Sequence, residues 1–138
     1  MLRRNQKVEL LRGVPLFELC SKTELAEIAT LADEVDVRKG KELIREWTNG
    51  REFFVLLEGR VDVSKDGRRI NRLSAGDFFG EIALIARSPV RTATVTATTP
   101  VRALVVTAQN FRQLLERSPR IKLKVLEALA ERIGPSGI

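Results

Sequence analysis

The stretch of residues 53–73, FFVLLEGRVDVSKDGRRINRL, indicates an antiparallel β fold. It opens with an uninterrupted apolar run, Phe53–Leu57, which is typical of a buried strand. Residues 60–64 then alternate apolar and polar side chains, as a half-buried strand does. Asp66-Gly67 is the dipeptide of a tight hairpin turn, so the chain returns as a further strand over residues 70–73.

Further short strands flank this stretch on both sides. Val35 and Val37 alternate with charged residues, and the pair Leu43-Ile44 follows a turn at Gly40. Two more strands are predicted beyond it, over residues 91–97 and 101–106. Short strands at such close spacing favour an antiparallel sandwich or barrel. The predicted class is α+β, mainly β: an eight-stranded jelly-roll β-barrel over about residues 34–106.

Helices precede the predicted barrel. Ser21 and Glu24 have the spacing of a capping box, and apolar residues follow at helical intervals. The sequence therefore predicts a helix over about residues 22–32, after a shorter one over about residues 3–12.

Two helices are predicted after the barrel. The first covers about residues 108–116, and Ser118-Pro119 is a strong start signal for the second, which ends near Ile133. We therefore expect a single domain, residues 1–138, with its C-terminal helices over about residues 108–133.

The composition excludes several kinds of chemistry. The chain has no His and one Cys, so His-based triads, His-ligated metal sites and thiolate cages are not expected. Only carboxylates, amines, guanidinium groups and hydroxyls remain for chemistry, and no paired acid and base stand out. An enzyme is therefore not expected.

The net charge of +6 invites nucleic acid as a partner. The basic residues are dispersed, however, and the six Phe and one Trp are not interleaved with them as a base-stacking surface requires. Nucleic acid is thus only an alternative partner. We also expect no membrane span, because no apolar run approaches ~20 residues, and a cytoplasmic location, because no secretory signal is visible.

Arg91 is the most informative charged residue. In strand alternation it shares a face with Ala93, Val95 and Ala97, so its side chain is predicted to point toward the core. A buried guanidinium needs an anion, because an unpaired buried charge is very costly.

Gly80 opens a short predicted helix over about residues 81–86. Backbone N–H groups at such a start, here near Ile82 and Ala83, bind anions together with the helix dipole. They can converge with Arg91 on one group, and a phosphodiester with a single negative charge fits this set of donors.

Two roles are open to Glu81 beside such an anion. It can be a first-turn carboxylate that complements the helix dipole. It can also accept a hydrogen bond from a sugar hydroxyl, as acidic residues do in dinucleotide sites.

These residues bear a family resemblance. Phe79–Leu84, followed by Arg91–Val95, closely resembles the phosphate-binding cassette of cyclic nucleotide-binding domains. The order of helices and strands is similar over about residues 14–133. The resemblance implies a jelly roll that holds a short cassette helix, followed by two C-terminal helices.

The resemblance also implies roles for individual residues. Glu81 would hold the ribose 2′-hydroxyl, and Arg91 would pair with the cyclic phosphate. Thr92 stands where family members carry a hydroxyl that contacts the phosphate or a guanine amino group, although strand alternation turns it away from Arg91. Three further residues would line the site with backbone groups: Gly80, Ile82 and Ala83.

A side chain of the last helix typically caps the purine in this family, and three residues are candidates: Leu126, Leu129 and Ile133. The resemblance implies that ligand draws the cassette inward and that the C-terminal helices then move over the base. The same last helix is a candidate contact for a protein partner or a second copy of the chain.

Two features depart from the family pattern. Glu81 and Arg91 differ by ten in number where nine is common, so Val90 is an effective insertion; if the loop slipped, Arg87 would be the substitute cation. Trp47 stands where relatives often carry Gly.

The sequence thus predicts a non-enzymatic regulatory module that binds cAMP, with cGMP as the other ligand, and that needs no cofactor. Two alternatives stay open. One is a jelly-roll interaction module that has lost nucleotide binding. The other is the sensor fragment of a larger kinase, channel or transcription factor, because no output domain follows the last predicted helix.

Overall fold

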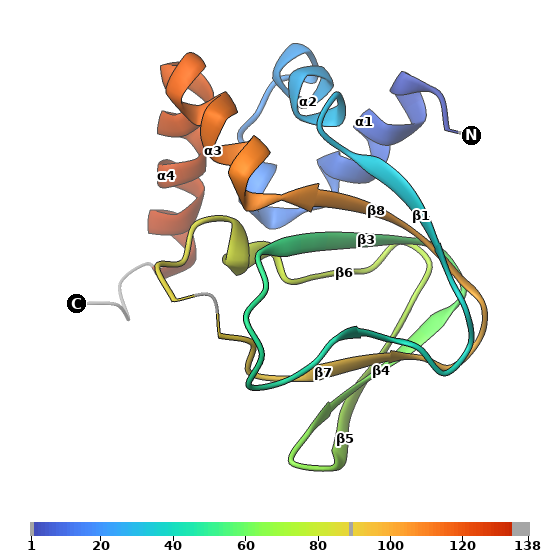
Figure 1. Cartoon of the computed structure of the whole chain (residues 1–138). Helices are drawn as coiled ribbons and strands as arrows, with labels where there is room; N and C mark the ends of the chain where they lie inside the picture. The colour runs from blue at the N-terminus through green and yellow to red at the C-terminus, as the bar shows by residue number, and fades with distance from the viewer. Residues whose placement is uncertain (1, 89, 134–138) are drawn as a thin grey trace. The chain divides into compact units, whose positions relative to one another are not determined.

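The computed structural model of the chain describes residues 2–88 and 90–133 (Figure 1). These fall into two compact units. A helical unit comprises the chain up to Ala32 and from Asn110 onward, and a barrel unit comprises Asp33–Gln109. Over the described ranges, no helix has the length and apolar character needed to cross a bilayer.

The helical unit contains the predicted helices. They are α1 (Arg4–Arg12), the 3-10 turn η1 (Pro15–Phe17), α2 (Lys22–Ala29), α3 (Ala108–Arg117, which begins in the barrel unit) and α4 (Pro119–Ile133). The capping box is confirmed: Ser21 Oγ accepts from Glu24 N at 3.2 Å, and Glu24 Oε1 accepts from Ser21 N at 2.7 Å. Helix α2 ends earlier than predicted, because Thr30 N bonds to Glu27 O, which tightens the last turn.

A partly buried ion pair joins two helices of this unit. Lys124 Nζ on α4 lies 2.5 Å from Glu24 Oε1 at the start of α2. Burial works against ionisation of Glu24, but the hydrogen bonds from Lys124 and Ser21 outweigh it and hold the pKa of this carboxyl below its ordinary value. The pair therefore stabilises the packing of α4 beside α2.

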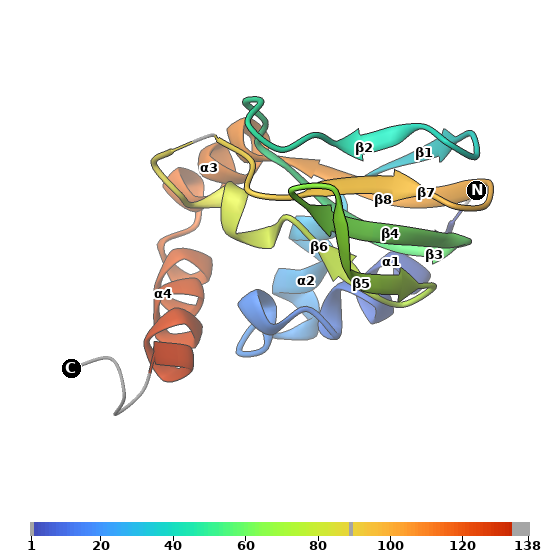
Figure 2. The ribbon, with the colours of Figure 1, turned by 90° about the horizontal axis from the view of Figure 1, so that it is seen from below.

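The described residues of the barrel unit form eight antiparallel strands in two four-stranded sheets, which confirms the predicted jelly roll. One sheet has the order β1 (Asp33–Val37), β8 (Val101–Thr107), β3 (Glu52–Glu58) and β6 (Phe78–Phe79). The other has the order β2 (Glu42–Ile44), β7 (Thr94–Ala97), β4 (Arg60–Lys65) and β5 (Arg68–Ser74), which Figure 2 shows from below.

The core of the barrel unit lies between the two sheets. Each sheet contributes alternate apolar side chains, such as Phe54 and Leu56 from β3 and Val95 and Ala97 from β7. The rings of Phe54 and Phe79 stack with centroids 4.9 Å apart, which fixes β6 against β3. The predicted hairpin joins β4 to β5, with Asp66 and Gly67 both at positive φ. This frame positions the segment that follows β6.

Candidate functional site

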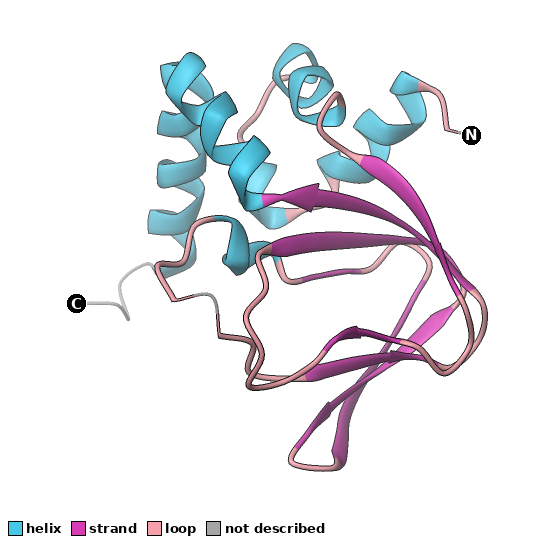
Figure 3. Ribbon diagram, viewed as in Figure 1, coloured by secondary structure: helices cyan, strands magenta, loops and turns pink. Residues whose placement is uncertain are grey.

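The segment after β6 turns sharply at Gly80. Gly80 has φ 80° and ψ 11°, and the 3-10 helix η2 (Glu81–Leu84) follows it in the connection to β7 (Figure 3). The predicted helix over residues 81–86 is therefore shorter, although Ala86 N still bonds to Ile82 O at 2.8 Å. A single turn has little dipole, so an anion here would meet individual N–H groups rather than a macrodipole. Of the predicted donors, Ala83 N already donates to Gly80 O at 3.1 Å.

Gly80 is also required by close packing. A Cβ at this position would lie 2.8 Å from Glu52 O and 3.2 Å from Arg91 Nη1. The backbone of the cassette thus approaches the Arg91 guanidinium as closely as a glycine allows.

Arg91 is buried, with 8% of its surface exposed. Its Nη2 donates to Glu52 O at 2.8 Å and lies 3.9 Å from the Glu52 carboxylate oxygen Oε1. Burial lowers the pKa of the guanidinium, and the charge of Glu52 partly offsets this effect. The prediction that this side chain points inward is confirmed.

The strand predicted over residues 91–97 is wrong at its start, because β7 begins at Thr94. The reason is the backbone of Arg91, whose N–H donates to Thr48 O and whose carbonyl accepts from Trp47 N, both at 2.9 Å. Val90, the inserted residue, forms a bridge with Asn49. Residues 90–91 therefore pair with the loop between β2 and β3 instead of continuing the ladder with β4.

This loop also shapes the space around the guanidinium. A Cβ at Gly50 would lie 2.7 Å from Arg91 Nε and 3.2 Å from Nη2. Gly50 is not among the residues with positive φ, so the need for glycine is one of space and not of backbone conformation.

Arg51 holds the far end of the cassette. Its guanidinium donates to Ala86 O at 2.5 Å and to Arg87 O, and its own carbonyl accepts from Ala108 N at 2.8 Å. Arg51 therefore links the exit of η2 to the first residue of α3. The side chain of Arg87 is exposed, so Arg91 and not Arg87 occupies the buried position.

A small cavity of about 150 Å³ lies beside Arg91. Gly80, Arg91 and Thr92 all border it, so three of the predicted site residues come together here. Thr92 is exposed to solvent and borders the opening, in spite of strand alternation. Apolar walls complete the cavity, formed by Ile44, Val63, Phe79, Ala93 and Val95.

The other predicted residues do not border this cavity in the described part of the chain. Glu81 is buried on η2, with 6% exposed, whereas Ile82 is half exposed and Ala83 is intermediate. On α4, in the helical unit, Leu126 is exposed and Leu129 is half-buried. The side chain of Ile133 lies outside the described residues.

Sequence reasoning missed Gly50 and Glu52, which both contact Arg91. Neither residue is among the site residues predicted from the sequence. Their contacts join residues about forty positions apart, and no local pattern indicates such a pairing.

The comparisons with known proteins agree on one family. A sequence model described as the cyclic nucleotide-binding domain matches residues 34–118. The chain is 36% identical over 126 residues to a cyclic nucleotide-gated potassium channel of Rhizobium etli, covering 91% of this chain and 35% of the channel. It is 38% identical over 122 residues to a cAMP-dependent protein kinase regulatory subunit of Mycosarcoma maydis, covering 82% of this chain and 23% of that protein. The chain thus spans little more than a third, at most, of the length of these relatives.

Solved structures share the fold. The N-terminal domain of a transcriptional regulator from Streptomyces coelicolor superposes with a TM-score of 0.81 at 29% identity. The match covers 93% of this chain and 92% of that domain. The similarity therefore extends beyond the barrel unit to most of the chain.

Proposed function

Because the chain belongs to the cyclic nucleotide-binding domain family, we propose that it binds a cyclic purine nucleotide at the cavity between Gly80 and Arg91, with cAMP preferred over cGMP. Domains of this family are regulatory and not catalytic. A cAMP-dependent kinase regulatory subunit among the relatives supports the preference for cAMP. We also propose that residues 1–138 act as one functional domain. The proposed location is the cytoplasm.

The burial of Arg91 beside an open cavity carries the proposal. In the described part of the chain, its side chain donates one hydrogen bond, from Nη2. Its Nη1 lies next to Gly80, where the cassette backbone comes closest. A buried cation with unused donors beside a cavity favours a singly charged phosphodiester, which supplies both the charge and the acceptors.

The remaining roles are those that the family resemblance implies. Glu81, buried on η2, would accept from the ribose 2′-hydroxyl, and the backbone of Gly80, Ile82 and Ala83 would line the phosphate. Thr92 at the mouth of the cavity would contact the phosphate or the base.

The size of the cavity limits what it can hold. Ligand pockets usually measure about 300–1,000 Å³, so a cavity of about 150 Å³ is too small to enclose a whole nucleotide. In the proposed complex the phosphate lies in the cavity and the purine lies outside it. The purine would then need a cover from elsewhere in the chain. The candidates remain Leu126, Leu129 and Ile133 on α4.

The proposed mechanism is a shift between two populations of the C-terminal helices. Arg51 is the physical link, because it bonds both the exit of η2 and the first residue of α3. Ligand that draws η2 toward Arg91 would pull on these contacts. The output would pass through α4 to a protein partner or to a second copy of the chain.

Trp47 provides a direct test. It is the sole Trp of the chain, and its backbone N–H donates to the backbone carbonyl of Arg91. We expect cAMP, and more weakly cGMP, to change the fluorescence of Trp47 in a saturable titration. Adenosine, which lacks the phosphate, serves as the control. A protein that responds to neither nucleotide would support a jelly-roll interaction module instead.

A further inference from the structure

We infer that Glu52 is an internal counter-anion of Arg91, which competes with the phosphate of an incoming nucleotide and sets the affinity of the site. This inference rests on the proposed function and adds a residue that determines affinity. It follows from the position of one carboxylate beside the Arg91 guanidinium.

The carboxylate of Glu52 is held near the guanidinium. Its Oε1 lies 3.9 Å from Arg91 Nη2 and accepts a hydrogen bond from Arg51 N at 3.1 Å. The backbone carbonyl of the same residue accepts from Nη2 at 2.8 Å. Glu52 is thus tethered by local backbone contacts in a place where its charge faces Arg91.

Among the described residues, no other carboxylate forms an ion pair with Arg91. The Arg51 guanidinium, which could have neutralised Glu52, is directed instead to the carbonyls of Ala86 and Arg87. The side chain of Glu52 is 41% exposed, so it can turn into solvent when another anion arrives. Without nucleotide, the buried charge of Arg91 is therefore compensated by Glu52, a carboxylate that can be displaced.

Two consequences follow from one cation and two competing anions. In the empty site, Glu52 offsets part of the cost of burying Arg91. In the occupied site, its negative charge repels the phosphate, which weakens binding. Removing the charge should therefore lower the stability of the nucleotide-free protein and at the same time raise its affinity for nucleotide.

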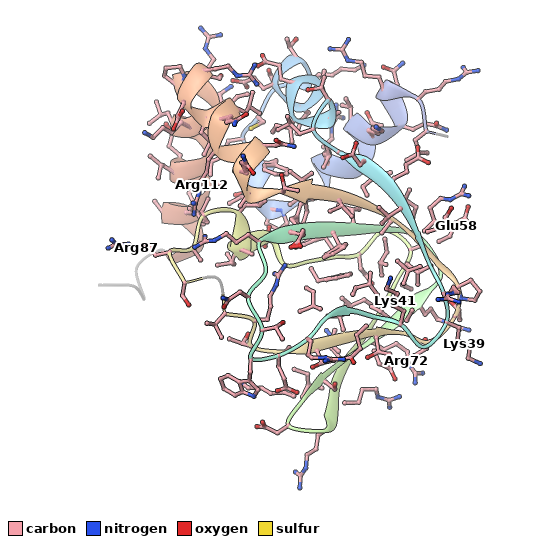
Figure 4. All side chains as sticks on the ribbon, in the orientation of Figure 1. Lys39, Lys41, Glu58, Arg72, Arg87 and Arg112 are labelled. Carbon is pink, nitrogen blue, oxygen red and sulfur yellow. The ribbon has the colours of Figure 1, made fainter. Side chains whose placement is uncertain are left out.

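The variant Glu52→Gln removes the charge and keeps the shape, the acceptor for Arg51 N and the backbone carbonyl. The matched control is Glu58→Gln, at the other end of the same strand. Glu58 Oε1 lies 4.0 Å from Arg102 Nη1, so it forms an ion pair of similar length with an arginine, but one that is more exposed to solvent. Figure 4 shows Glu58 at the opposite end of the barrel unit from Arg87, which follows the cassette.

The binding arm measures the dissociation constant for cAMP by calorimetry. We expect Glu52→Gln to bind about five- to tenfold more tightly than the parent, at the low end of coupling between sites because the carboxylate is partly exposed. Glu52→Ala should show the same direction, and Glu58→Gln should bind as the parent does. A gain in affinity cannot come from a misfolded variant. Equal or weaker binding by Glu52→Gln would overturn the inference.

The ligand-free arm is a double-mutant cycle of Glu52→Gln and Arg91→Met, followed by urea unfolding. We expect Glu52→Gln to lower the urea midpoint of the parent but not that of Arg91→Met. Additive effects would overturn the counter-anion role. If the parent binds neither nucleotide, the proposed function fails, whereas this arm still decides whether Glu52 compensates Arg91.

Discussion

Gly50→Ala tests how closely the loop between β2 and β3 fits the Arg91 guanidinium. The new Cβ would lie 2.7 Å from Arg91 Nε, whereas ordinary contacts begin at 3.4 Å, so the guanidinium must move by about 0.7 Å. It has little freedom to do so, because Nη2 is bonded to Glu52 O and the backbone of Arg91 is bonded to Trp47 and Thr48.

A movement of this size would stretch the bond from Nη2 to Glu52 O from 2.8 Å to about the limit of a hydrogen bond. Loss of a hydrogen bond to a charged group costs about 1.5–3 kcal/mol. A guanidinium displaced by this distance would lose a bond of the same strength to the proposed phosphate, so the affinity for cAMP should fall about ten- to a hundredfold.

Calorimetric titration with cAMP measures this change, and Gly13→Ala is the matched control. Gly13 has φ −75°, and a Cβ there would meet its nearest atom at 3.7 Å, so this variant should bind as the parent does. Both variants should keep the far-UV circular dichroism of the parent. A folded Gly50→Ala protein with unchanged affinity would refute the packing argument around Arg91.

Three further predictions concern charge, strain and pH. Arg91→Ala should weaken cAMP binding by about 2–5 kcal/mol and Glu81→Ala by about 1–3 kcal/mol, and calorimetry that found Arg91→Ala as tight as the parent would remove the phosphate assignment. Trp47→Gly should raise the free energy of unfolding by about 1 kcal/mol, because Trp47 has φ 67° and a side chain that is 70% exposed; a lower urea midpoint would contradict this. Glu24 has a pKa below its ordinary value of 4.5, so its contribution to stability is complete above that pH and is lost as the pH falls through the folded-state pKa. In acid unfolding experiments, Lys124→Met should lose less stability than the parent as the pH falls. The same pH dependence in both proteins would argue against a stabilising pair of Lys124 and Glu24.

Much of the fold could be predicted because its signals are local. The alternation of residues 60–64, the Asp66-Gly67 turn and the Ser21 capping box each act within a few positions, and the structure contains all three. The start of β7 could not be predicted, because the backbone of Arg91 bonds to residues 47 and 48 instead of continuing the ladder.

The candidate site divides in the same way. Gly80 and Arg91 were predicted because a glycine at the start of a short helix and a charged residue on an apolar face are visible in the sequence, and the structure places both beside one cavity. Gly50 and Glu52 were not, because their roles depend on contacts with a residue about forty positions later. The cassette is thus a local motif, whereas the surroundings that tune it arise from the tertiary fold.

Calorimetric titration of the intact chain with cAMP and cGMP, after unfolding, dialysis and refolding to remove retained ligand, tests the central claim most directly. We expect saturable heat with a dissociation constant in the micromolar range or below, tighter for cAMP than for cGMP. The absence of heat with both nucleotides, in a protein that has refolded to its native circular dichroism, would contradict nucleotide binding at Arg91.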